Sequence, residues 1–133
     1  MKYGLKKEGK FNYTEIGEGR PIIILHGLMG GLSNFDGVIK EFSVNGYKLV
    51  LPELPVYTQT LINTNVKSFS KYLKEFINYR NYKDFVLLGN SLGGHIGLYY
   101  IKLNPELVAG LIITGSSGLY ESAMGGGYTK RSD

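Results

Sequence analysis

Four short apolar runs recur along the 133-residue chain, and segments with helical spacing separate them. The runs cover residues 21–25, 47–51, 85–88 and 107–113 and consist largely of leucine and β-branched side chains. Continuous apolar runs of this length are typical of strands that are covered on both faces of a sheet. Their alternation with helices predicts βαβ units, and hence an α/β fold with a mainly parallel sheet and helices on both faces.

The segments between the runs carry apolar residues three and four positions apart, as one face of a helix requires. Helices are therefore expected at residues 33–42, 65–77 and 92–103, and Asn104-Pro105 ends the last of them. A further, half-exposed strand is expected at residues 11–16, because apolar and polar side chains alternate there.

The composition excludes several kinds of function. The chain contains no cysteine, so disulfides, thiolate catalysis and cysteine-ligated metals are excluded. The net charge of +4 comes from lysines and arginines scattered among acidic residues. Nucleic-acid binding needs basic residues clustered on one face. We therefore expect no nucleic-acid partner, no metal and no cofactor.

The length fits one domain, which buries a single core. The first ten residues contain lysines but no apolar stretch of the kind that forms the centre of a signal peptide. The apolar runs are far shorter than the ~20 residues that a membrane helix needs. We expect a cytoplasmic protein that does not bind membranes.

The sequence Gly89-Asn90-Ser91-Leu92-Gly93 is a G-x-S-x-G motif between the third apolar run and the last predicted helix. A strand that turns at once into a helix brings the residues two before and two after the serine into contact, where only glycine leaves room. The turn strains the serine backbone, raises its hydroxyl above the sheet and places it at a helix N-terminus, where developing negative charge is stabilised. We predict Ser91 to be a nucleophile. The alternative is an ordinary glycine-rich turn.

A second loop, His26-Gly27-Leu28-Met29-Gly30-Gly31, follows the first apolar run. The carboxyl ends of parallel strands share one edge of a sheet, so this loop and the Ser91 turn can face one reacting group. The backbone amides of Leu28 and Leu92 are then candidates for an oxyanion hole. The alternative is that these glycines only permit a tight turn. The candidate pocket residues are His26, Gly27, Met29 and Asn90.

The strand order, His26-Gly27 and the turn at residues 89–94 resemble the α/β-hydrolase superfamily over about residues 11–113. In carrying serine at the turn, the chain resembles the esterase, lipase and carbon–carbon hydrolase branches, whereas the haloalkane dehalogenase and epoxide hydrolase branches carry aspartate there. The resemblance implies a small-molecule ester or related carbonyl substrate and an acyl-enzyme formed on Ser91.

Two features depart from that family. After residue 51 the chain reads Pro52-Glu53-Leu54-Pro55-Val56, where many relatives carry an aspartate and a glycine-rich turn. The family also places the triad acid and the histidine on loops after the serine. The only acids that follow Ser91 are Glu106, Glu121 and Asp133, and the only histidine is His95, one turn into the helix. None of them fits a triad position.

We therefore expect residues 1–133 to be the N-terminal portion of a single α/β-hydrolase domain, inactive in isolation and truncated after the strand near residue 113. Residues 114–133 would be the start of a lid region or a disordered tail. An unpaired sheet edge would favour self-association.

Two other interpretations remain open at this point. One is a non-catalytic small-molecule binding module of the same fold. The other is a nucleotide-binding domain, although Met29 stands where a G-x-G-x-x-G motif needs its second glycine.

Overall fold

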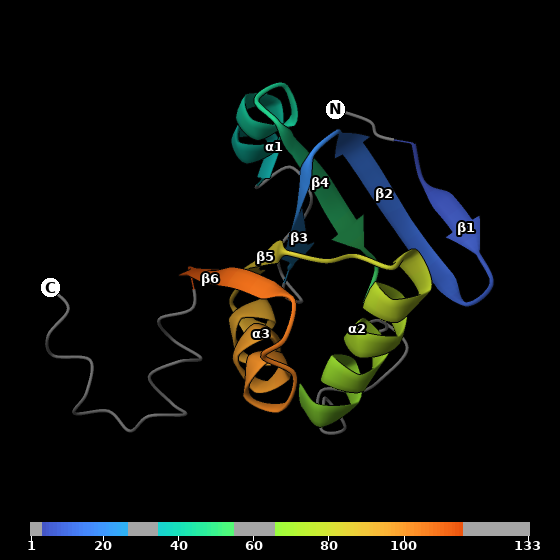
Figure 1. Cartoon of the computed structure of the whole chain (residues 1–133), viewed down its shortest axis with the longest axis vertical. Helices are drawn as coiled ribbons and strands as arrows, with labels where there is room; N and C mark the ends of the chain where they lie inside the picture. Colours follow the sequence, from blue (N-terminus) through green and yellow to red (C-terminus); the bar gives the residue numbers. More distant parts are fainter. Residues whose placement is uncertain (1–3, 27–34, 55–65, 116–133) are drawn as a thin grey trace, which may run out of the picture.

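The computed structural model describes residues 4–26, 35–54 and 66–115, which form a six-stranded sheet with helices on both faces (Figure 1). The strands and helices are β1 (Lys6–Glu8), β2 (Phe11–Gly17), β3 (Arg20–Leu25), α1 (Asp36–Ser43), β4 (Tyr47–Pro52), α2 (Val66–Arg80), β5 (Phe85–Asn90), α3 (Leu92–Leu103) and β6 (Val108–Thr114). The order across the sheet is β1-β2-β4-β3-β5-β6. The β1·β2 and β2·β4 pairs are antiparallel and the remaining pairs are parallel, so the predicted mainly parallel α/β sheet is confirmed.

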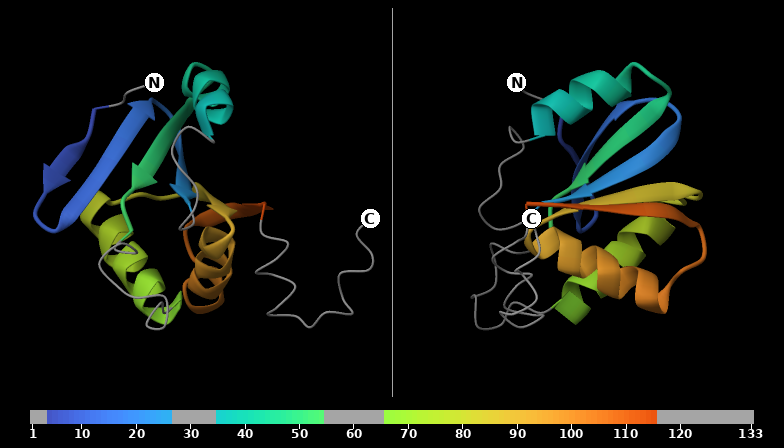
Figure 2. Two further views of the ribbon diagram at one scale, coloured as in Figure 1. Left: turned by 180° about the vertical axis from the view of Figure 1, so that it is seen from behind. Right: turned by 90° about the vertical axis from the view of Figure 1, so that its left-hand side faces the viewer.

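The helices lie on opposite faces of the sheet because successive residues of a strand point to opposite sides. Ile22 and Ile24 of β3 pack in the core beneath α1, whereas Ile23 and Leu25 belong to the core beneath α2 and α3. Figure 2 shows α1 on one side of the sheet and the other two helices on the far side. The continuous apolar run of β3 is therefore buried on both faces, as its sequence predicts.

The amphipathic pattern of α2 is confirmed by its packing. Its buried apolar residues are Phe69, Leu73, Phe76 and Ile77, which repeat every three or four positions. The helix begins at Val66, and the predicted cap at Asn65 lies outside the described residues, as does the predicted start of the first helix at Ser33. Within the described ranges no helix is long and apolar enough to cross a membrane.

The prediction that residues 107–113 form a buried strand is wrong in one respect. The strand exists as β6, but its residues are half-buried or exposed, with Ile112 and Ile113 exposed to 51% and 39%. The reason is its place in the sheet: β6 is the last strand in the order, and among the described residues it pairs with β5 alone.

Candidate functional site

The turn between β5 and α3 holds Ser91 in a backbone conformation with φ 58° and ψ −119°. Residues other than glycine rarely adopt this backbone conformation. The two glycines of the motif, Gly89 and Gly93, permit the close backbone contacts that this turn requires. A β-carbon on Gly89 would lie 2.5 Å from the Gly93 carbonyl oxygen and 2.7 Å from the Cα of Gly94. The residues two before and two after the serine are thus in contact, as the spacing predicts.

The turn packs directly against the end of β3. A β-carbon on Gly93 would overlap the carbonyl oxygen of Leu25, the last residue of that strand. The next residue, His26, is buried, with 7% of its surface exposed. Because β3 and β5 are parallel and in register, the structure brings His26 and Ser91 to the same edge of the sheet.

The end of β6 contacts the turn from the other side. The Ser91 N–H donates to the Thr114 carbonyl oxygen at 3.1 Å, and the Thr114 hydroxyl donates to the Asn90 side-chain oxygen at 3.2 Å. Asn90 is one of the pocket residues predicted from the sequence, whereas Thr114 was expected to belong to the lid region or tail that follows the strand. The available signal was a threonine at the carboxyl end of a parallel strand, where the site also lies.

Leu92 is the predicted oxyanion donor of the Ser91 turn. It is the first residue of α3, and the first N–H groups of a helix have no acceptor within the helix. Its side chain is buried in the core, which leaves its backbone amide as the group that the prediction concerns. The other predicted residues of the β3 loop, Gly27, Leu28 and Met29, lie outside the described residues.

His95 faces α2. It lines a small hollow with Val66 of α2 and with Leu98, Tyr99 and Lys102 of its own helix. Of the acids that follow Ser91, only Glu106 lies within the described residues. Those residues also contain no cluster of three or more His, Asp or Glu side chains that could hold a metal ion.

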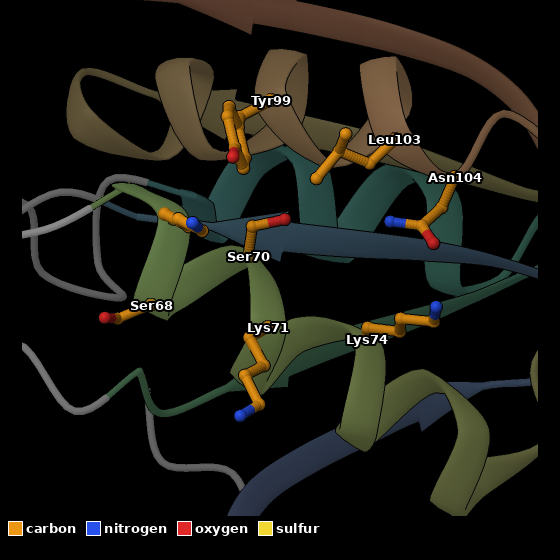
Figure 3. Close-up of a pocket in the computed structure, with 8 residues that line it drawn as sticks. Ser68, Ser70, Lys71, Lys74, Tyr99, Leu103 and Asn104 are labelled. Atoms are coloured by element: carbon orange, nitrogen blue, oxygen red, sulfur yellow. The ribbon is translucent and has the colours of Figure 1, made fainter.

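A cavity of about 400 Å³ lies between α2 and α3 (Figure 3). Tyr99 and Leu103 of α3, and Asn104 directly after it, project towards α2, while the Lys71 amine points away from the gap. None of the predicted site residues lines it. The cavity therefore belongs to the helical layer and not to the edge that carries Ser91. Its full lining is Lys67, Ser68, Ser70, Lys71, Lys74, Tyr99, Leu103 and Asn104.

A known family and several solved structures are similar to this chain. The family described as alpha/beta hydrolase fold matches residues 20–130. An alpha/beta hydrolase enzyme, MGS-MChE2, from the metagenome of sediments of the Mar Chica lagoon in Morocco, is 58% identical with a TM-score of 0.80; the match covers 98% of this chain and 59% of that one. A marine microorganism esterase is 25% identical with a TM-score of 0.66, over 84% of this chain and 41% of that one.

Curated relatives are hydrolases as well. The 2-hydroxy-6-oxo-6-(2'-aminophenyl)hexa-2,4-dienoic acid hydrolase of Metapseudomonas resinovorans is 32% identical over an alignment of 114 positions, and the match covers 80% of this chain and 39% of that protein. The chain thus spans about two fifths of the length of this relative.

Proposed function

Since the chain belongs to the α/β-hydrolase family, we propose that Ser91 is the nucleophile of a hydrolase that cleaves an ester or related carbonyl compound through an acyl-enzyme. The observation that carries the proposal is the strained Ser91 backbone, with φ 58°, at the junction of a buried strand and a helix. Strain of this kind persists only where the surroundings enforce it, and it concentrates at functional sites. Here Gly89 and Gly93 allow the backbone packing that enforces it.

The proposed reaction follows from the groups at this edge. The Ser91 hydroxyl attacks the substrate carbonyl carbon while a histidine base takes its proton. The resulting oxyanion accepts hydrogen bonds from the amides of Leu92 and Leu28, and the leaving group departs with the proton. Water then hydrolyses the acyl-enzyme by the same steps.

Neither His26 nor His95 is proposed as the base. His26 directly follows β3, and His95 faces α2. In the family the triad acid and histidine follow the serine in chain order. We propose that the triad acid and histidine correspond to positions in the part of the relatives that this chain does not cover.

The proposed substrate is a small molecule with an electrophilic carbonyl group. The relatives named above include an esterase and a hydrolase whose named substrate carries a 6-oxo group. With an ester, attack by Ser91 breaks the bond from the carbonyl carbon to the alkoxy oxygen; with such a ketone it breaks a bond from the carbonyl carbon to a neighbouring carbon, which leaves with the proton. We also propose a cytoplasmic location, which the absence of cysteine favours.

Labelling with a fluorophosphonate probe tests the proposal on the 133-residue chain and on any longer product of its gene. We expect the form that includes the base to be labelled at one site, and Ser91→Ala to abolish labelling. Ser70→Ala is the matched control, because Ser70 is a buried serine on α2 that lines the helical cavity, away from the edge of the sheet that carries Ser91. If no form is labelled, the nucleophile assignment fails and the non-catalytic binding module replaces it.

A further inference from the structure

The end of β6 holds the proposed nucleophile from the side opposite β3, and we propose that Thr114 is a positioning residue for Ser91. The inference rests on the proposed function of Ser91. Thr114 does more than end β6, because its carbonyl oxygen and its hydroxyl form hydrogen bonds with two successive residues of the turn.

The two hydrogen bonds involve the residues on either side of one peptide bond, the bond between Asn90 and Ser91. The Thr114 carbonyl oxygen accepts from the Ser91 N–H at 3.1 Å, and the Thr114 hydroxyl donates to the side-chain oxygen of Asn90 at 3.2 Å. Asn90 and Thr114 are also partners in the parallel register of β5 and β6. The peptide that links Asn90 to Ser91 is therefore tied to β6 through both the backbone and a side chain.

The residues on either side of Thr114 also meet the turn. A β-carbon on Gly94 would lie 2.9 Å from the Cγ2 atom of Ile113, so this helix approaches β6 closely. Gly115 has φ 53°, and a β-carbon there would overlap the Asn90 side-chain oxygen. Ile113, Thr114 and Gly115 thus all lie against the turn, and Thr114 is the one that forms hydrogen bonds with it.

This contact matters because the Ser91 conformation is strained. A positive φ at a serine relaxes unless its neighbours oppose the change. On one side Gly93 is packed against the Leu25 backbone. On the other side the opposing contact is Thr114. Nucleophilic attack depends on placing the reacting oxygen accurately, and small displacements lower the rate.

Two substitutions separate the hydroxyl from the shape of the side chain. Thr114→Val removes the hydroxyl but keeps the β-branched shape, whereas Thr114→Ser keeps the hydroxyl. We expect Thr114→Val to slow fluorophosphonate labelling of Ser91 about 2- to 10-fold, the range for loss of one neutral hydrogen bond. Amide hydrogen exchange at Ser91 should become faster in the same variant. Thr114→Ser should restore both properties, and Ile112→Val, a change at an exposed side chain of the same strand, should alter neither.

The outcomes are distinguishable. If the unsubstituted protein is labelled and Thr114→Val is labelled at the same rate, the role of Thr114 is overturned while the proposed function stands. If Thr114→Val and Thr114→Ser slow labelling equally, the effect is loss of strand packing and the role is again overturned. If the unsubstituted protein is not labelled in any form, the proposed function fails and takes the role of Thr114 with it.

Discussion

Two helical glycines of this protein have opposite surroundings. At Gly93, in the first turn of α3, an added β-carbon would overlap the carbonyl oxygen of Leu25. The obstacle is backbone, which cannot move aside as a flexible side chain can. At Gly37, in α1, an added β-carbon would meet nothing within 4 Å. The first glycine is required by close packing of the turn on β3, and the second is not required by contacts.

We predict that Gly93→Ala lowers the free energy of unfolding by about 1–3 kcal/mol, the usual cost of forcing extra atoms into a packed interior. Gly37→Ala should instead raise it by about 0.5–1 kcal/mol, because alanine favours a helix over glycine. Urea unfolding followed by circular dichroism measures both. A Gly93→Ala protein as stable as the original would show that the turn does not pack on β3 as described.

At this scale the sequence was sufficient to predict the strained turn at Ser91 and the contact between its flanking glycines, because a five-residue motif encodes the local turn. Thr114 was not predictable in the same way. Its contact with Asn90 joins residues 24 positions apart. Only the register of β5 and β6 brings them together, and register depends on the whole sheet.

Between elements, Glu15 connects β2 to the end of α2. The Arg80 guanidinium donates to both of its carboxylate oxygens, at 3.0 and 2.9 Å, and the Tyr82 hydroxyl donates to the same group. The Glu15 side chain is only 8% exposed. Burial alone would raise the pKa of this carboxyl, but the hydrogen bonds from Tyr82 and Arg80 outweigh it and hold the pKa below its usual value.

The lowered pKa predicts how stability changes with pH. A carboxyl whose pKa is lower in the folded state than its unfolded value of about 4.3 contributes stability above that value. The contribution is lost as the pH falls through the folded pKa. We expect Glu15→Gln to reduce the free energy of unfolding at pH 7 by about 1 kcal/mol, since bonds to a charged acceptor are stronger than bonds to a neutral one. The difference from the original protein should shrink as the pH is lowered below about 4.

Urea titrations at a series of pH values test this expectation. Glu18→Gln is the matched control, because Glu18 lies exposed in the turn before β3 and should show no such pH-dependent difference. A Glu15→Gln difference that stays constant down to acidic pH would mean that the carboxylate charge is not what stabilises the contact.

The elements themselves were largely predictable, because their apolar spacing reports burial. The predicted helix at residues 92–103 coincides with α3. The strand β1 was not predicted, since Lys6-Lys7-Glu8 has no apolar alternation. It forms because Gly9, with φ 61°, allows the chain to turn back and pair with β2. The burial of β6 was overestimated because an apolar run does not reveal whether a strand is central or at an edge.

At the scale of the whole molecule, five of the exposed large apolar side chains of the described residues lie on α3, on β6 or in the connection between them. They are Leu98, Leu103, Leu107, Ile112 and Ile113. The same region carries the free edge of the sheet, since β6 is last in the strand order of the described chain. Unpaired strand edges with apolar side chains are templates for pairing with another chain. We therefore propose that two copies of the 133-residue chain associate through this edge.

Sedimentation of the 133-residue chain should accordingly reveal association that increases with concentration. Ile112→Lys should weaken it, because a charged side chain at a free edge opposes strand pairing. Val44→Lys is the matched control: Val44 is 79% exposed, compared with 51% for Ile112, but it follows α1 on the other face of the sheet. Equal effects of the two lysines would point to general charge repulsion, which any added positive charge supplies on a chain of net charge +4. A monomer at every concentration would instead mean that the edge is protected, and the proposed association would then be wrong.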